Sequence, residues 1–326
     1  MTTTERIAAL LPTGGDLAEM LENAALADSH GYEAINVTHI AARDSFSCIA
    51  RLSGHVQHAA LGTAVAPIYH RSPASMAQAA ATVAEMTGGR FRLGLGTGHQ
   101  VTMGGWHGQT IGKPVAEMRE YVSVVRAVLD GTTPFEGSRW STTFAFVGWA
   151  PRGEVPIHLA ALSPGMLKLA GEIADGVLLW ACPSSYVRDV VVPAVTEGRA
   201  SVGKTLDRFT IAAAVPTSLD DESGVAQAGI RAELHRYFGL PYYRRMFERA
   251  GYGKDIAGYD SAADTDGQLA AISDEFLADL CAIGDEIDLA ASIQRYRDAG
   301  ANLPMITHVR GTVFDKAIAA AAPRTH

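Results

Sequence analysis

Strand-like and helix-like segments alternate along this chain, and this alternation constrains its fold more than any other feature. The expected strands are residues 6–11, 33–38, 59–66, 90–97, 156–161, 176–180, 209–215 and 303–308. Helical patterns follow them at 16–29, 44–52, 73–87, 114–129, 164–174, 185–202, 222–250 and 313–321, with a further helix at 287–299. Repeated strand–helix units predict a parallel sheet. Eight units in 326 residues favour an α/β fold, a closed (β/α)8 TIM barrel, with a doubly wound open sheet as the alternative.

Two segments do not fit the repeat. Residues 131–153 (GTTPFEGSRWSTTFAFVGWAPRG) are rich in aromatic and turn residues, and residues 220–285 are too long for one connection. We interpret both as insertions, the second of which must hold extra helices. Since no low-complexity linker interrupts the chain, we expect residues 1–326 to form one barrel domain.

Charge and apolar content exclude several classes of partner. The net charge is 27 − 35 = −8 and the charges are scattered, whereas binding nucleic acid needs clustered Lys and Arg. No apolar run approaches the roughly 20 residues of a membrane helix, and residues 1–15 lack the pattern of a signal peptide. We therefore expect a cytoplasmic protein with no nucleic acid and no membrane partner.

The cysteines give no sign of a cross-linked or metal-binding protein. Cys48, Cys182 and Cys281 are odd in number and far apart, and no CxxC pair is present. A disulfide framework and a structural zinc site are both disfavoured by this spacing. Free thiols in the core or in loops, and no metal, are expected.

The stretch GGRFRLGLGTGH, residues 88–99, has the alternation of a strand and then a glycine-rich end beside His99. A dinucleotide-binding fingerprint needs GxGxxG opening directly into a helix. Here His99 replaces the last glycine, and residues 100–114 are interpreted as a glycine-rich loop. A plain turn is one interpretation. The other is a barrel strand whose C-terminal end contributes to an active site, where small residues let a flat ligand approach the backbone.

Polar or small residues recur at other expected strand ends, which meet at one mouth in a barrel. The segments are Thr38-His39, Thr63-Ala64-Val65, Ala161-Leu162-Ser163, Trp180 and Thr307-His308. After the fifth strand, Ser163 suits a helix N-cap and Pro164 the first helical position. The N–H groups of Gly165 and Met166 would then favour a phosphate at the helix start, although an ordinary capped helix explains the same residues.

Taken together, several motifs resemble the luciferase-like monooxygenase superfamily. They are GGRFRLGLGTGH, LGTAVAPIYHRSP, GWHGQTIGKPVAEMREYV, VPIHLAALSPGMLKLAGEIADGVLL and IQRYRDAGANLPMI. The resemblance covers most of residues 5–215 and 285–320, and it is closest to the deazaflavin (coenzyme F420)-dependent branch with the methylenetetrahydromethanopterin reductase-like enzymes. It implies a (β/α)8 barrel with insertions, a cofactor at the C-terminal mouth and, as is common in the family, a homodimer.

The resemblance also implies which residues contact the cofactor. A non-prolyl cis peptide on the third strand, here Ala64–Val65, supports the ring, and the fourth and fifth strand ends hold the phosphate and side chain. The cofactor-binding residues expected on this basis are Thr38, Thr63, Ala64, Val65, Thr97, Gly98, Ala161, Leu162, Ser163, Gly165 and Met166. Tyr69, Trp106, His107 and Trp180 are the expected walls of a substrate pocket, with residues 103–111 and 131–153 as its cover.

The sequence departs from the family pattern at two places. Many F420 enzymes have Asp-His after the second strand, where this chain has Thr38-His39. The sugar-phosphate dehydrogenases of the branch have Glu after the fourth-strand GTG, where this chain has His99. Proton transfer is then left to His39, His99 or the substrate itself, since the ordinary pKa of a histidine lies near neutrality.

The function implied is an F420-dependent oxidoreductase that transfers a hydride between the deazaflavin C5 and a small organic substrate. An FMN-dependent monooxygenase of the same fold is the first alternative, and an Arg or Lys near the phosphate, such as Lys168, would favour it. A non-catalytic flavin-binding barrel is the second alternative, kept because the acid before His39 is missing.

Overall fold

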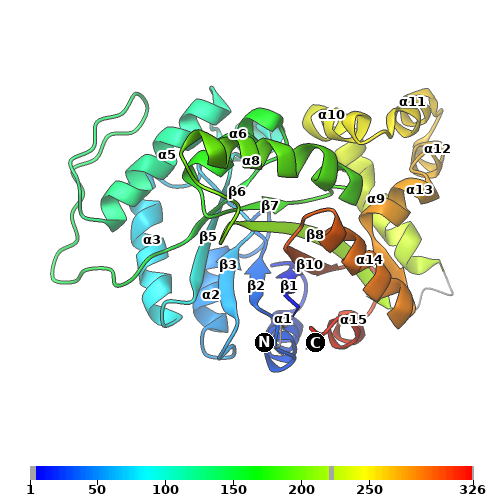
Figure 1. The fold of residues 1–326 in the computed structure, drawn as a ribbon, viewed down its shortest axis with the longest axis horizontal. Helices are drawn as coiled ribbons and strands as arrows, with labels where there is room; N and C mark the ends of the chain where they lie inside the picture. The colour runs from blue at the N-terminus through cyan, green and yellow to red at the C-terminus, as the bar shows by residue number, and fades with distance from the viewer. Residues whose placement is uncertain (1–4, 220–223, 325–326) are drawn as a thin grey trace.

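Within residues 5–219 and 224–324, which the computed structural model describes, eight parallel strands close into a barrel, and the predicted (β/α)8 fold is confirmed. The strands are β1 (Ala8–Leu11), β2 (Ala34–Val37), β3 (Ala60–Thr63), β5 (Phe91–Gly96), β6 (Ile157–Ala160), β7 (Gly176–Leu179), β8 (Thr210–Leu219) and β10 (Leu303–His308). Because β10 pairs with both β1 and β8, the sheet closes (Figure 1). The C-terminal ends of the strands therefore meet at one mouth.

Several barrel helices begin at residues whose side chains satisfy free backbone N–H groups. Asp16, Asp44, Ser72 and Ser163 each accept a hydrogen bond from the first turn of the helix that follows. The helices are α1 (Leu17–Ser29), α2 (Ser45–Leu52), α3 (Pro73–Met86), α5 (Pro114–Leu129), α6 (Pro164–Ile173), α7 (Ser184–Tyr186) continued by the π-helical η1 (Val187–Val191) and α8 (Val192–Ser201), α14 (Glu286–Asp298) and α15 (Phe314–Ala320). Their expected bounds differ from these by one or two residues at most.

Two expected strands differ from those observed. The strand expected at 59–66 divides into β3 and the short β4 (Ala66–Pro67), because the peptide bond Ala64–Val65 is cis. The strand expected at 209–215 continues to Leu219, where it pairs with an unexpected short strand, β9 (Ala282–Gly284).

The interpretation of residues 100–114 as a loop was wrong in its first half. Residues Gln100–His107 form helix α4, which ends where Gly108 adopts a left-handed conformation with φ of 63°. The helix persists despite two internal glycines because Met103 is buried, 3% exposed, and packs on Gly98. Tertiary packing here outweighs the weak helix propensity of glycine.

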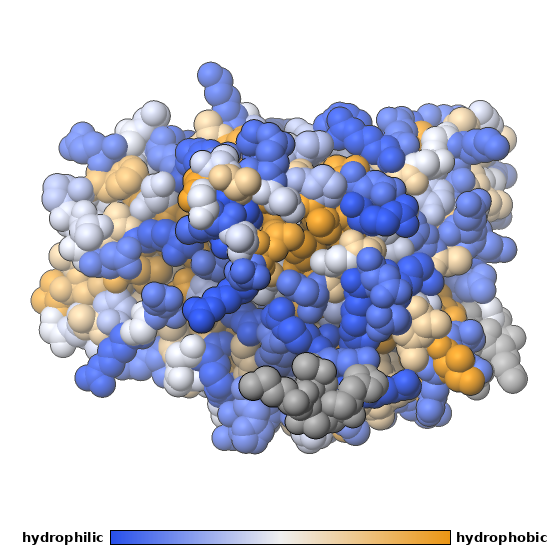
Figure 2. Space-filling model, viewed as in Figure 1, coloured by the Kyte–Doolittle hydropathy of each residue, from blue (hydrophilic) through white to orange (hydrophobic). Residues whose placement is uncertain are grey.

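The insertion at 131–153 projects from the barrel beside α5 as a loop without helices (Figure 1). Its only regular feature is one antiparallel bridge between Phe135 and Thr142. The carboxylate of Glu120 anchors it by accepting the backbone N–H groups of Ser138, Arg139 and Trp140. Figure 2 shows a mostly hydrophilic face with apolar side chains at its centre and toward this loop, where Val147 is 93% exposed.

The described part of the second insertion is largely helical. It contains α9 (Val225–Phe238), α10 (Pro241–Arg249), α11 (Gly253–Ser261), α12 (Thr265–Ala270) and α13 (Asp274–Leu280). The single helix expected over 222–250 breaks after Phe238, because Pro241 lacks the N–H that a continuing helix requires. The expected start, Glu222, lies outside the described residues.

The interior of the barrel is filled with small and medium side chains, so only its mouth is open. These are Ala8, Leu10, Ala34, Leu178, Ala212, Ala214, Leu303 and Met305. A much larger apolar core lies between the strands and the surrounding helices. Among the helices of the described ranges, none combines the length and apolar character needed to cross a membrane.

Candidate functional site

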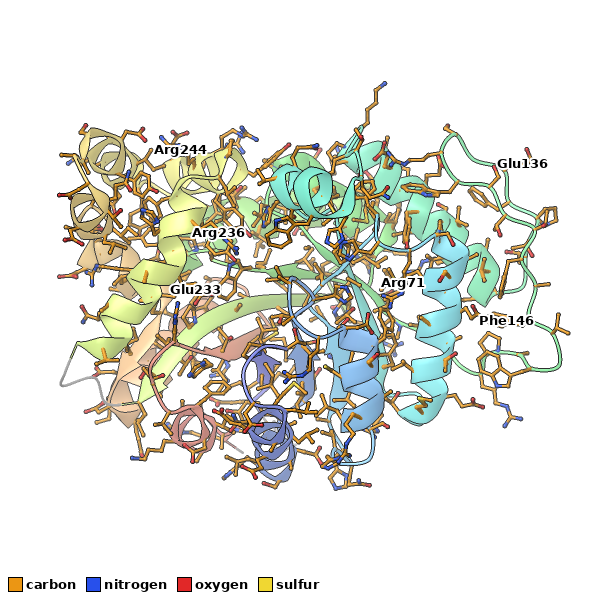
Figure 3. The ribbon with its side chains drawn as sticks, turned by 180° about the vertical axis from the view of Figure 1, so that it is seen from behind. Arg71, Glu136, Phe146, Glu233, Arg236 and Arg244 are labelled. Carbon is orange, nitrogen blue, oxygen red and sulfur yellow. The ribbon has the colours of Figure 1, made fainter. Side chains whose placement is uncertain are left out.

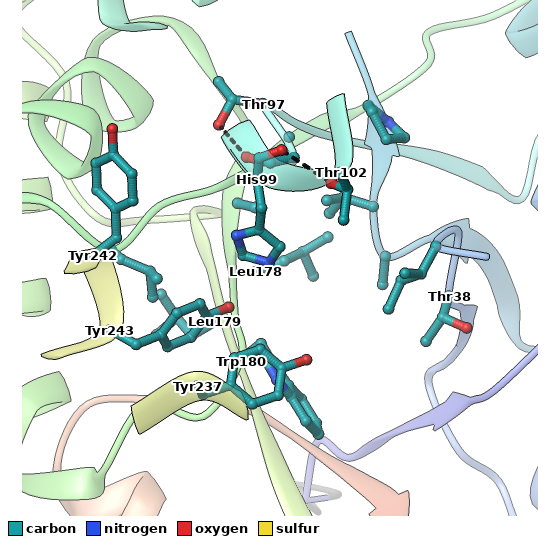
Figure 4. Close-up of a pocket in the computed structure, with 18 of the residues that line it drawn as sticks. Thr38, Thr97, His99, Thr102, Leu178, Leu179, Trp180, Tyr237, Tyr242 and Tyr243 are labelled. Carbon is teal, nitrogen blue, oxygen red and sulfur yellow. Dashed lines mark hydrogen bonds between the residues drawn. The ribbon is translucent and has the colours of Figure 1, made fainter. Parts of the chain in front are cut away.

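A cavity of about 760 Å³ occupies the mouth of the barrel. Most of the residues singled out from the sequence line it. They are Thr38, His39, Ala64, Val65, Thr97, Gly98, His99, Trp106, His107, Ala161, Leu162, Ser163, Met166 and Trp180. Figure 4 shows Thr38 on one side of this space and His99, Trp180 and Tyr237 on the other. Residues more than 140 positions apart in the chain are thus brought to one site, as the barrel interpretation predicted.

Three residues from the same set do not line this cavity. Thr63 is fully buried, and its Oγ1 donates to Gly94 O at 2.7 Å and accepts Gly94 N–H at 2.9 Å. Side chains alternate between the two faces of a strand, so Thr63 faces away from the cavity that the next residue, Ala64, lines. Tyr69 donates to Glu117 Oε2 at 2.5 Å beside a smaller pocket, and burial followed by this bond raises its pKa. Gly165 lies at the start of α6, outside the lining.

The floor of the cavity consists of small residues around the cis peptide bond. Ala64 and Val65 lie next to Gly96, where an added Cβ would come within 2.5 Å of Val65 Cγ2 and 3.4 Å of Ala160 Cβ. Below them, an added Cβ at Gly94 would lie 1.9 Å from the carbonyl oxygen of Thr63. Larger side chains have no room at Gly94 and Gly96, because neighbouring protein atoms fill the space, so the floor is built of closely packed, mostly apolar residues.

The start of α6 provides a polar corner of the site. Ser163 Oγ accepts the N–H of Met166 at 3.3 Å, so the expectation that Met166 offers a free N–H was wrong. The N–H of Gly165 is left unused within the helix, as is usual at a first turn. Lys168 does not line the cavity, because its Nζ pairs with Glu197 Oε1 at 2.5 Å on the outer surface.

His39 is held by the start of α2. Its Nδ1 lies 2.8 Å from Ser45 Oγ and accepts the Ser45 backbone N–H at 3.3 Å. Asp44 Oδ2 is 3.9 Å from the same nitrogen, so a carboxylate approaches His39 even though Thr38 replaces the family's acid. Burial lowers the pKa of His39, and Arg71 and His107 act in the same direction against Asp44. The ring is therefore neutral at pH 7.

His99 belongs to an aromatic wall on the other side of the mouth. Its ring lies 6.4 Å from that of Tyr237 and 5.8 Å from that of Tyr243, and Trp180 packs on Tyr237 at 5.9 Å (Figure 4). Burial, followed by the nearby Arg236 guanidinium, lowers the pKa of His99. This histidine is consequently neutral at pH 7 as well.

The wall formed by α9 and α10 was not anticipated from the sequence. It contributes Glu233, Arg236, Tyr237, Tyr242, Tyr243, Arg245, Met246 and Arg249, and Arg310 follows β10. Figure 3 shows Glu233 and Arg236 on α9, far from the loop with Glu136 and Phe146. No residue of 131–153 lines the cavity, so α9 and α10 cover the mouth where that loop was expected. The stretch HRYFGLPYYRRMFER, residues 235–249, carried the signal as an unusual concentration of aromatic residues and arginines.

This wall gives the cavity a positive lining in a protein with a net charge of −8. Four arginines line it, against the single carboxylate of Glu233. Burial raises the pKa of Glu233 even though Arg236, His308 and Arg310 oppose the shift. A ligand with acidic groups is therefore favoured.

Comparison with known proteins agrees with this geometry. The family model described as luciferase-like monooxygenase matches residues 1–303. A 5,10-methylenetetrahydromethanopterin reductase of Archaeoglobus fulgidus is 34% identical over 209 residues, which are 63% of this chain and 62% of that enzyme. The match thus spans less than two thirds of the length of that relative.

Two further comparisons extend the likeness. An F420-dependent glucose-6-phosphate dehydrogenase of Nocardia farcinica is 30% identical over 232 residues, 65% of this chain and 68% of that enzyme. The solved structure of the coenzyme F420-dependent tetrahydromethanopterin reductase from Methanopyrus kandleri has a TM-score of 0.83, with 98% of each chain covered. At 22% identity, this last comparison establishes similarity of fold.

Proposed function

This chain belongs to the luciferase-like monooxygenase family, and from that premise we propose that it is an F420-dependent oxidoreductase acting on a small organic substrate. In this reaction a hydride would be exchanged between the deazaflavin C5 and the substrate. The observation that carries the proposal is that Ala64, Val65, Gly96 and Ala160, all compact and apolar, line the cavity floor, where they suit a planar ring lying against the backbone. Relatives that are F420-dependent by name, such as the N. farcinica dehydrogenase, support the choice of cofactor.

The residues of the mouth fit the parts of such a cofactor. Ser163, which lines the cavity at the positive end of the α6 dipole, suits a phosphate group. The arginines of α9 and α10 suit further acidic groups. The deazaflavin supplies a carbon that accepts or releases a hydride, and the protein supplies position and electrostatics.

The chain's own residues would then position the substrate and exclude water. Trp106, Trp180 and Tyr237 present aromatic surface around the space above the floor. We assign proton handling to the cavity histidines, among which His39 and His99 are the two expected from the sequence. We also propose a cytoplasmic homodimer, on the family resemblance alone.

The FMN-dependent alternative differs in the chemistry that it requires. Deazaflavin has carbon in place of the flavin N5 and does not readily form an oxygen adduct, so the two cofactors lead to different reactions. Lys168, the cation that would favour FMN phosphate, pairs with Glu197 outside the cavity. Four arginines also line the cavity, so its cations do not decide between the two cofactors; the F420-dependent relatives favour F420.

Turnover tests this proposal. Reduced F420 is mixed anaerobically with the protein and a panel of small carbonyl and unsaturated compounds, and the return of the visible absorbance of oxidised deazaflavin is followed. We expect reoxidation that depends on both protein and substrate. Product formation only with reduced FMN and oxygen would contradict the proposal and establish oxygen insertion instead.

A further inference from the structure

Both ring nitrogens of His39 are already used within the protein. The backbone N–H of Ser45 points at His39 Nδ1, 3.3 Å away, and Ser45 Oγ lies 2.8 Å from the same atom. A backbone N–H can only donate, so Nδ1 is the acceptor. The proton of the neutral His39 ring therefore resides on Nε2.

That proton fixes the state of a second histidine. His39 Nε2 lies 3.3 Å from His70 Nδ1, so Nε2–H donates and His70 Nδ1 accepts. The proton of neutral His70 must then reside on its Nε2. This atom is buried and makes no hydrogen bond within residues 5–219 and 224–324. A buried donor without a partner is costly and calls for a functional explanation.

The surroundings of His70 indicate where an acceptor for its Nε2–H can come from. Its ring lines the main cavity and also a neighbouring pocket of about 360 Å³, each shared with His39 and His107. The His107 ring packs against it, with centroids 4.0 Å apart. The three rings do not form a metal site, since the described residues hold no group of three or more His, Cys, Asp or Glu arranged for a metal ion.

We propose that His70, and not His39, supplies the N–H that bonds the ligand at this side of the mouth once the His107 ring packed against it moves aside and uncovers Nε2, and that His39 is the positioning residue that fixes the tautomer of His70. The ligand atom is an oxygen acceptor, the carbonyl or hydroxyl oxygen of the organic substrate. The identity of the ligand rests on the proposed function. The assignment of donor and acceptor between His39 and His70 rests on the structure alone.

The charge state of His70 agrees with this role. Burial lowers the pKa of His70 to about 4, and His107, His39 and Arg71 act in the same direction. A neutral imidazole stabilises negative charge that develops on an oxygen without placing a full positive charge in the site. Removing such a donor typically costs a factor of about 10²–10³ in turnover.

Histidine-labelled ¹⁵N NMR of the full-length protein tests the order directly. At pH 7, we expect His39 and His70 both to be neutral with the proton on Nε2. In His39→Leu, His70 should become a mixture of tautomers, whereas His39→Gln, whose amide can donate, should preserve the Nε2–H form. Finding His70 with its proton on Nδ1, or protonated at pH 7, would overturn the proposal.

Turnover of the variants with reduced F420 separates the two roles. We expect His70→Leu to lower kcat by about 10²-fold, with part of the rate restored in His70→Gln, which keeps a donor near the Nε2 position. His39→Gln should lose less turnover than His39→Leu, because its amide can still donate to His70 Nδ1. Equal loss in both His39 variants would show that His39 itself bonds the ligand. If F420 does not bind at all, the proposed function fails, while the NMR result still decides the hydrogen-bond order.

Discussion

Replacing Gly94 by alanine is expected to prevent the barrel from closing normally and to lower the free energy of unfolding by more than about 3 kcal/mol. The added Cβ would lie 1.9 Å from the Thr63 carbonyl oxygen and 2.7 Å from Leu178 Cδ1. The first of these atoms belongs to the backbone of the neighbouring strand, so it cannot move aside alone. The denaturant midpoint and the soluble yield measure the effect.

Gly105→Ala is the matched control. Gly105 lies within α4, and an added Cβ there meets nothing within 4 Å. Alanine is a better helix former than glycine, so this variant should be neutral or stabilised by about 0.5–1 kcal/mol. If Gly94→Ala unfolded at the same denaturant concentration as the parent, the close approach of β3 and β5 described above would be incorrect.

Replacing Ala160 by leucine is expected to remove cofactor binding while the protein stays folded. Ala160 ends β6 beside Gly96, and its side chain forms part of the cavity floor. A leucine would fill the space that the ring needs. We expect the Kd for F420 to rise by at least about 100-fold, which corresponds to ~2.7 kcal/mol.

Ala291→Leu provides the control for this substitution, because Ala291 is exposed on α14 and does not line the cavity. Circular dichroism should show that both variants retain the parent fold, and only Ala160→Leu should lose binding. Unchanged F420 affinity in folded Ala160→Leu would place the cofactor elsewhere than on the floor.

The sequence carries enough information for the barrel itself. Strand and helix periodicity is a local property, and caps such as Asp16 and Ser163 mark where helices begin. The strand ends were also identified, since small residues such as Gly96 and Gly98 interrupt an otherwise apolar alternation. Pairing of β10 with β8 closes the barrel and so brings these strand ends together, whatever side chains they carry.

The errors arose where tertiary contacts outweigh local preference. Residues 100–107 contain adjacent glycines, and only the burial of Met103 against Gly98 explains why they are helical. Thr63 was assigned to the cavity although strand alternation turns it toward Gly94. The helix at 100–107 and the orientation of Thr63 depend on which residues pack against them in the folded protein. The spacing of residues along the chain does not reveal those contacts.

The missing part of the site comes from a segment that carries no family motif. Glu233 and Arg236 lie on α9, and α9 could be placed over the mouth only once the course of the second insertion was known. His70 was within reach of sequence reasoning, because it lies in the turn that follows β4 and so is close to a strand end. The sequence could not show that both ring nitrogens of His39 make hydrogen bonds within the protein, whereas Nε2 of His70 makes none within the described residues.

Titration of the purified protein with F420 and, separately, with FMN tests the central claim most directly. Trp106 and Trp180 line the cavity, so quenching of tryptophan emission reports occupancy of the mouth. The account predicts saturable quenching by F420, at lower concentration than by FMN. Tight binding of FMN alone would contradict the account and make an oxygen-inserting enzyme the working hypothesis, and binding of neither would favour a barrel without this catalytic role.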